Sequence, residues 1–232
     1  MPVSHRSIVL DWLGYATIRL RGRTGVTVYV DPGRYGVLDG HRPEDGDLVL
    51  VSHDDHYDPD GIERVARDDA IVVVHEAIDA DAIDRVSRQP SALPYDVERV
   101  ASDAAFALGP LDLFTTPAYN RPDGPHARDD GTPYHPEGSG CGFGVTIDGV
   151  TVFWPGDTDA LPALETIDAD VLCPPIGGRF TMDRHEAAEL ARAIQPDLVV
   201  PVHYDTFDAI ETDAVAFLTD VGTSGIPVAL DD

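Results

Sequence analysis

Residues 47–60 read Asp-Leu-Val-Leu-Val-Ser-His-Asp-Asp-His-Tyr-Asp-Pro-Asp, and they set the fold that we expect for the chain. The run Asp47–Ser52 is apolar between its two polar ends, as in a strand buried on both faces of a sheet. It ends directly at His53. A short helix is expected over Asp60–Arg67 and a second buried strand over Ile71–His75. Strands followed by helices predict sheets covered by helices.

Two other apolar strands also end at a residue of the metal-binding type. Val152–Trp154 runs into Pro155-Gly156-Asp157, and Leu198–Val202 ends at His203. The end of a buried strand is where a rigid scaffold presents a side chain to an open rim. Three strands ending in this way indicate one shared site.

The other elements are predicted from β-branched runs, capping residues and turn signals. Asp148-Gly149 favours a tight hairpin, because these residues tolerate the positive φ angles of a type I′ turn. Residues 120–140 form a long polar loop, which in a compact domain is usually functional. No repeat or linker divides the chain, so we expect one domain over residues 1–232. Strands are expected at Ser7–Asp11, Thr17–Leu20, Val26–Val30, Ala105–Leu108, Leu111–Thr115, Phe143–Ile147 and Val171–Pro174, and helices at Ala77–Ser87, Asp183–Ile194 and Thr212–Leu218.

The composition is globular but strongly acidic. Hydrophobic residues make up 43% of the chain, whereas 42 acidic side chains face 16 basic ones, all arginine, for a net charge of −26. Such a surface repels nucleic-acid phosphates and anionic lipids, so we expect neither a nucleic-acid nor a membrane partner. We interpret the charge as an adaptation to a high-salt, halophilic solvent that screens self-repulsion. The alternative, a specific basic partner, lacks the support of a localised acidic tail.

Cysteine usage and hydropathy favour a soluble, cytoplasmic protein. Cys141 and Cys173 are too few for a disulfide framework and lack zinc-ribbon spacing, so we expect both to be small buried residues. The segment Met1–Leu10 has no uninterrupted apolar core of a signal peptide. No run approaches the ~20 apolar residues of a membrane-spanning helix.

The stretch Ser52–Asp60 brings two imidazoles and several carboxylates close together in sequence. His nitrogen and carboxylate oxygen suit Zn(II), and also Mn(II) or Fe(II). Each candidate also has a structural interpretation: the stretch as a solvated acidic turn, Asp157 as a turn or helix cap, and His203 as a core histidine. All three must hold together for no site to exist, so a shared metal site is the favoured hypothesis.

Ordered motifs along nearly the whole chain carry a family resemblance. They are Trp12–Thr17, Val30–Pro32, Val51–Asp58, Ala118–Asn120, Tyr134–Pro136, Trp154–Asp159, Pro174–Gly178 and Val200–Tyr204. In this order they resemble the metallo-β-lactamase-fold hydrolases, in particular the branch with L-ascorbate-6-phosphate lactonase and many uncharacterised archaeal and bacterial hydrolases. The resemblance implies a layered α/β or α+β fold, an αββα sandwich with its site at one edge between the sheets. It also implies one or two divalent ions, zinc first, with Mn, Fe or Ni as alternatives.

The first motif fits the family's His-x-His-x-Asp-His pattern in two ways. Without a gap, Asp55 stands at the second His, Tyr57 at the Asp and Asp58 at the last His. With one inserted residue, His56 and Asp58 take the second His and the Asp, while Pro59 replaces the last His. The gapped alignment is favoured because it keeps a His and an Asp in their usual roles. Either alignment lacks one nitrogen ligand, so the second metal site is left open.

The resemblance implies hydrolysis of a small-molecule ester, lactone or phosphoester by a metal-activated water. In this hypothesis His53, His135 and His203 supply nitrogens and Asp157 bridges or orients the metals. Asp58 ligates a second ion or holds the attacking hydroxide, and then protonates the leaving group. The alternative is a catalytically altered metal-binding or ligand-sensing protein on the same fold, and a homo-oligomer is left open.

Further residues are candidates for substrate contacts. Asn120 and His126 belong to the polar loop, although an exposed position is favoured for His126. Arg179 could meet an anionic group such as phosphate, and a surface arginine is the equal alternative. His185 is expected on the surface of a helix. Tyr15 replaces the histidine of the family's N-terminal element, which alters a contact around the metal.

Overall fold

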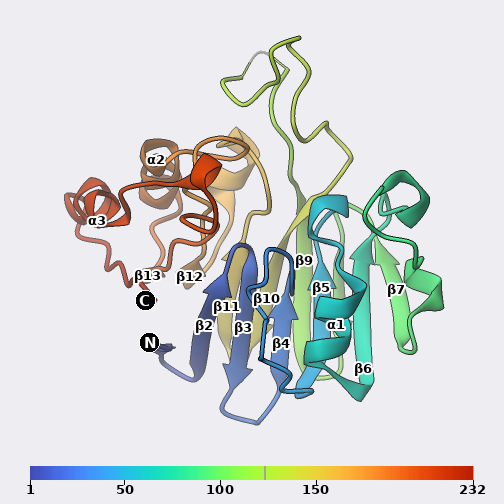
Figure 1. Cartoon of the computed structure of the whole chain (residues 1–232). Coiled ribbons are helices and arrows are strands. Elements are labelled where there is room, and N and C mark those ends of the chain that lie inside the picture. Colours follow the sequence, from blue (N-terminus) through green and yellow to red (C-terminus); the bar gives the residue numbers. More distant parts are fainter. Residues whose placement is uncertain (123, 232) are drawn as a thin grey trace.

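The computed structural model describes residues 1–122 and 124–231. Asp123 and Asp232 lie outside the described residues, and the single domain over 1–232 stays a prediction. Two sheets face each other (Figure 1). The first has the order β1 (Val3–His5), β2 (Ile8–Gly14), β3 (Thr17–Gly22), β4 (Thr27–Val30), β5 (Gly46–Val51), β6 (Ala66–His75) and β7 (Asp96–Val100). The second has the order β13 (Leu198–Val199), β12 (Val171–Leu172), β11 (Val150–Trp154), β10 (Cys141–Ile147), β9 (Leu111–Pro117) and β8 (Ala105–Leu108).

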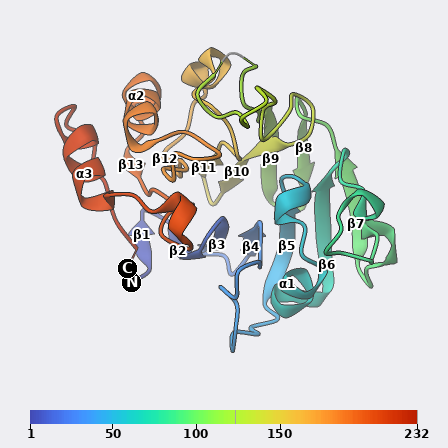
Figure 2. The same ribbon diagram turned by 45° about the horizontal axis from the view of Figure 1, so that its top comes forward.

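Helices cover the outer faces of both sheets (Figure 2). α1 (Pro59–Val65) packs Ile62 and Val65 against the outward side chains of β4, β5 and β6. α2 (Arg184–Ile194) and α3 (Ala214–Gly222) pack on the outer face of β11, β12 and β13. This order of layers confirms the αββα sandwich. Among the described residues, no helix has the length and apolar character needed to cross a membrane.

The main core lies between the two sheets. Leu20 and Leu50 of the first sheet belong to the same buried cluster as Phe143, Val145 and Val152 of the second. Alternate residues of each strand point into this core, because successive side chains of a strand point to opposite faces. The buried strand expected at Asp47–Ser52 is β5, and the expected hairpin across Asp148-Gly149 joins β10 and β11.

The helix expected over Ala77–Ser87 is wrong. The segment makes only a single 3₁₀ turn, Ala80–Ala82. The Asp79 carboxylate accepts the backbone N–H of Asp81, and the side-chain oxygen of Gln89 accepts that of Ala80. Aspartate side chains compete in this way for backbone groups and favour turns over helix interiors.

Several element boundaries also differ from expectation. Only the first two residues of the strands expected at Val171–Pro174 and Leu198–Val202 pair within the named sheet. The rest of each segment continues towards the site through an isolated bridge between Pro175 and Val202. The last helix, predicted over Thr212–Leu218, begins two residues later at Ala214, with Asp213 as its N-cap, and ends at Gly222.

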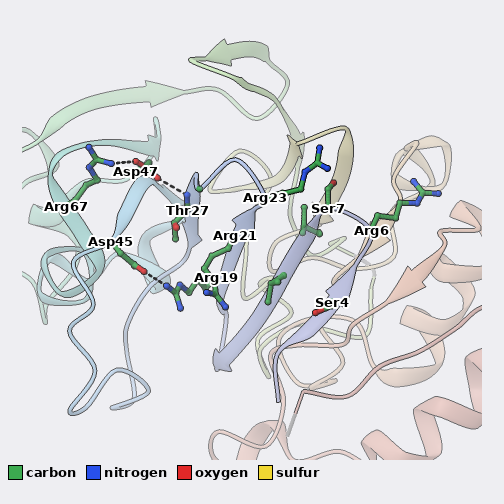
Figure 3. Close-up of a pocket in the computed structure, with 14 residues that line it drawn as sticks. Ser4, Arg6, Ser7, Arg19, Arg21, Arg23, Thr27, Asp45, Asp47 and Arg67 are labelled. Carbon is green, nitrogen blue, oxygen red and sulfur yellow. Dashed lines mark hydrogen bonds and ion pairs between the residues drawn. The ribbon is translucent and has the colours of Figure 1, made fainter.

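The outer face of β2 and β3 has no described helix over it and carries an Arg–Asp network instead. Five arginines line a hollow of about 650 Å³ there (Figure 3): Arg6, Arg19, Arg21, Arg23 and Arg67. Most of them pair with carboxylates, namely Arg6 with Asp170 and Asp197, Arg19 with Asp45, and Arg67 with Asp47 and Asp69. The hollow is therefore a neutralised network and not a free basic patch.

One packing contact of α1 predicts a stability difference between two helical glycines. A Cβ atom on Gly61 would lie 2.3 Å from the carbonyl oxygen of Pro32, whereas a Cβ atom on Gly222 meets nothing within 4 Å. We expect Gly61→Ala to lower the free energy of unfolding by about 2–3 kcal/mol. Gly222→Ala should leave it unchanged or raise it by up to ~1 kcal/mol. Denaturant unfolding in high-salt buffer measures both, and equal values for the two variants would contradict this close approach.

Candidate metal centre

The first sheet delivers two buried histidines from one tight turn. β5 ends at Val51, Ser52 follows, and the 3₁₀ turn Asp54–His56 (η1) begins after His53. This turn places the His53 and His56 rings on the same side, with ring centroids 4.2 Å apart. Both side chains are at most 3% exposed.

The second sheet and its loops supply the rest of the centre. Asp157 follows β11, His203 follows the extended segment after β13, and His135 comes from the long loop before β10. The Nε2 atoms of four histidines surround one oxygen, Oδ2 of Asp157. The distances are 3.7 Å from His53, 3.7 Å from His56, 3.5 Å from His135 and 3.3 Å from His203.

The chemistry of these atoms fits a bound cation. His53 Nε2, His56 Nε2, Asp157 Oδ1 and both ring nitrogens of His203 are buried without a hydrogen-bond partner among the described residues. Burying polar atoms without partners is costly, and a metal ion would satisfy the three Nε2 atoms and the Asp157 oxygen, although not Nδ1 of His203, which points in another direction from Nε2 of the same ring. Three sets of residues have ligand atoms close enough to hold an ion. One is His53 with the exposed Asp54 and Asp55. The other two are buried and share Asp157. They are His53, His135 and Asp157, and His56, Asp157 and His203.

A hydrogen-bond network from the core orients the two histidines of the first turn. Asp31 Oδ2 lies 2.9 Å from His56 Nδ1, and Ser52 Oγ lies 3.0 Å from His53 Nδ1. Trp154 donates its indole N–H to the same Asp31 oxygen at 2.9 Å. Partners that hold Nδ1 fix the ring and leave Nε2 to face the centre. Neither Asp31 nor Ser52 was predicted to orient the site, although each directly follows a buried strand.

Two loops hold the other histidines. His135 Nδ1 lies 3.2 Å from both Asn120 Oδ1 and the Phe180 carbonyl oxygen. The backbone N–H of His203 donates to the Tyr15 carbonyl oxygen at 2.9 Å, and both residues have left-handed φ angles of 58° and 49°. Non-glycine residues adopt this conformation at a cost, and such residues concentrate at functional sites.

The surroundings of the centre shift the pKa values of its histidines and of Asp157. Burial lowers the pKa of His53 to about 3, so its imidazole is neutral and its nitrogen lone pair is free to bind a metal. Burial would raise the pKa of Asp157, but the His203 and His56 rings hold it well below its ordinary value. Burial likewise opposes a charge on His56, yet Asp157 and Asp31 raise its pKa.

The two carboxylates proposed from the first motif lie in different places. Asp58 accepts the backbone N–H groups of Arg34, Asp60 and Gly61, and it caps α1. The structure does not bring Asp58 to the two sets around Asp157, because its carboxylate is occupied at the start of this helix. Asp55 is 59% exposed and lies at the rim of the cavity above Asp157.

The expected substrate residues have other partners. Asn120 is fully buried and accepts the backbone N–H of His135, so it positions a candidate ligand. The expectation of an exposed His126 is wrong: it is 4% exposed, with its Nε2 2.9 Å from a carboxylate oxygen of Glu186. Arg179 is exposed and lies over the Tyr134 ring. His185 is exposed, and Cys141 and Cys173 are buried, as predicted.

The His126–Glu186 pair predicts a pH-dependent stability. Burial opposes protonation of His126, but the Glu186 carboxylate raises its pKa. Partial burial of Glu186 works against a lower pKa there, yet the hydrogen bond with His126 lowers it. The histidine's contribution is present below its unfolded pKa of about 6.5 and is lost as pH rises through the higher folded value. The glutamate's contribution is lost as pH falls below its unfolded value of about 4.3.

We therefore expect the thermal midpoint of the wild-type protein to exceed that of His126→Gln most near pH 5.5, roughly between those two values. The difference should shrink towards about pH 8.5, where the imidazole is neutral. Glu186→Gln keeps an oxygen for the Asp183 N–H and removes the charge. In the Glu186→Gln background, His126→Gln should therefore change the thermal midpoint by a similar amount at every pH. A difference between wild type and His126→Gln that is the same at all pH values would contradict the proposed ion pair.

The chain is similar in sequence to a known protein family. Residues 9–203 match the family model described as a beta-lactamase superfamily domain. A UPF0173 metal-dependent hydrolase of Methanosphaerula palustris is 34% identical over 90% of this chain and 88% of its own length. One from Methanoculleus marisnigri is 31% identical over 95% of this chain and 92% of its own.

Solved structures agree in fold. A metallo hydrolase from Ignicoccus hospitalis superposes with a TM-score of 0.70 at 24% identity, covering 96% of this chain and 94% of its own. The metallo-beta-lactamase fold protein YhfI from Bacillus subtilis superposes with a TM-score of 0.67 at 14% identity, over 95% and 94% of the two chains. With a family model over most of its length and relatives above 30% identity, this chain belongs to the beta-lactamase superfamily.

Proposed function

We propose that the protein is a metal-dependent hydrolase that acts on a small-molecule ester, lactone or phosphoester. The observation that carries the proposal is the convergence of four imidazole Nε2 atoms on one oxygen of Asp157, several of them buried without a partner. Relatives across nearly the whole chain carry the name metal-dependent hydrolase. An ester, lactone or phosphoester is the substrate class that the family resemblance implies.

In this proposal, Asp157 is shared between two ligand sets, and His53 with His135 and His56 with His203 complete them. A divalent ion bound there supplies Lewis acidity, which lowers the pKa of a coordinated water from 15.7 towards about 7. Two imidazoles and one carboxylate in each set suit zinc among the divalent ions. One ion in either set, or one in each, suits this arrangement.

Asp55 takes over the proton-transfer role that the first motif suggested for Asp58. Its carboxylate lies at the cavity rim beside His135 and Asp157, whereas Asp58 is engaged by three backbone N–H groups. A carboxylate at this rim can accept the proton of the attacking water and return it to the leaving oxygen.

Metal content tests the ligand assignment directly. Asp157→Asn should reduce bound Zn, Mn, Fe and Ni by at least about tenfold after expression with each metal, because it removes the charge common to both sets. Elemental analysis of purified protein measures this. The control is His185→Gln on the exposed face of α2, which should retain the wild-type content. Equal metal content in Asp157→Asn and wild type would remove Asp157 from the ligand set.

Hydrolysis is tested by removal and return of the metal. We expect the metal-loaded protein to hydrolyse at least one of a panel of phenyl acetate, δ-valerolactone, dihydrocoumarin and bis(p-nitrophenyl) phosphate. Chelation should abolish the activity and added zinc should restore it, because the ion generates the nucleophile. Stoichiometric metal without turnover of any compound would instead favour the ligand-sensing alternative. The structural reason for that alternative is Pro59, which stands where the family's first motif has its last histidine and which begins α1.

A further inference from the structure

A cavity of about 260 Å³ opens directly above the candidate metal centre. His135 and Asp157 form part of its lining, so any molecule in it meets the centre. Its remaining walls are mainly aromatic: Tyr15, Tyr35, Tyr134, Phe180 and Phe207. These are five of the chain's 15 Phe and Tyr residues, from the count of 7 Phe and 8 Tyr, gathered around one opening.

The aromatic rings form a continuous wall. The Tyr35 ring lies 4.8 Å from that of Tyr15 and 4.6 Å from that of Phe207. Phe180 links Phe207, at 6.4 Å, to Tyr134, at 4.8 Å. These residues come from five separate segments of the chain, so the wall exists only in the folded protein. Tyr35 is 50% exposed at the mouth and is one of three exposed large hydrophobic residues among those described.

The charges around the cavity do not suit a phosphate group. Arg128 is the one arginine in the described lining, and it already lies over the Tyr134 ring at 5.0 Å. Two carboxylates, Asp55 and Asp157, face the same space. Arg179, the cation considered for an anionic substrate, is not among the lining residues. Away from the centre itself, the lining holds one carboxylate, Asp55, and one arginine, Arg128, so a multiply charged anion would meet no net positive charge there.

The size of the cavity suits one aromatic ring. An apolar cavity of about 150 Å³ accommodates a benzene molecule. A space of about 260 Å³ therefore holds a single six-membered aromatic ring together with a short ester or lactone group. Aromatic walls bind such a ring by offset stacking or edge-to-face contact.

We propose that this aromatic-walled cavity selects an uncharged carboxylic ester or lactone that bears one aryl ring. The inference rests on the proposed function. Water's oxygen forms the new bond to the carbonyl carbon, the ester C–O bond breaks, and the proton of the water ends on the leaving oxygen. The ring of the substrate lies against Tyr35 and Phe207, and its carbonyl group faces His135 and Asp157.

A pair of lactones tests the cavity. Dihydrocoumarin and δ-valerolactone share a six-membered lactone, but only the first carries an aryl ring. Their intrinsic reactivities differ, so each variant is compared with wild type on the same compound. Phe207→Ala and Tyr35→Ala should lower kcat/KM for dihydrocoumarin by about tenfold, mainly through KM, and leave δ-valerolactone within about twofold. Val215→Ala, an exposed apolar residue on α3, is the control and should change neither.

A binding measurement separates failure of the cavity proposal from failure of the proposed function. Saturation-transfer NMR with benzyl alcohol on the metal-loaded protein reports ring binding without turnover. Binding should be present in wild type and Val215→Ala and be lost in Phe207→Ala, even if no lactone is hydrolysed. Absence of benzyl alcohol binding in wild type overturns the cavity proposal. An equal loss of kcat/KM for both lactones in Phe207→Ala also overturns the cavity proposal. So does a preference for phenyl phosphate that Phe207→Ala leaves unchanged. The proposed hydrolase function survives each of these results.

Discussion

The structure depends on one constraint: a carboxylate and four imidazoles are buried together where the two sheets meet. Four histidine Nε2 atoms lie 3.3–3.7 Å from one oxygen of Asp157. Two of these histidines follow the first sheet, and the others belong to the segments of the second. Desolvated polar atoms without partners are expensive unless a counter-charge holds them. The relative position of the sheets and the binding capacity of the site are therefore coupled.

The coupling extends into the core through Asp31. This residue follows β4, is 1% exposed, and joins the His56 ring to the indole of Trp154 from the opposite sheet. Ser52 adds its backbone N–H and its hydroxyl to the same carboxylate. Both oxygens of Asp31 have partners in this buried network, and a well-connected network of this kind rigidifies its surroundings. The packing of the two sheets against each other and the orientation of the site histidines therefore depend on the same buried residues.

The sequence allowed prediction of the residues whose position follows from a strand. His53, Asp157 and His203 each come after an apolar run, and the structure brings all three together with His135. It could not decide which of Asp55, His56 and Asp58 are ligands, because their orientations depend on the 3₁₀ turn and on the start of α1. The burial of His126 was also out of reach, since its partner Glu186 lies 60 positions away on α2. Contacts of this kind leave no local pattern in the sequence.

The aromatic cavity and the acidic surface bear on the same question of substrate charge. A net charge of −26 lowers the local concentration of anions around the protein, most of all at low ionic strength. A phosphoester would have to overcome this field and then enter a cavity lined by two carboxylates and one arginine. An uncharged aryl ester or lactone meets neither barrier and gains apolar contact with five rings. The acidic surface thus favours the uncharged character of the substrate that we propose, and the five aromatic rings of the cavity favour its aryl ring.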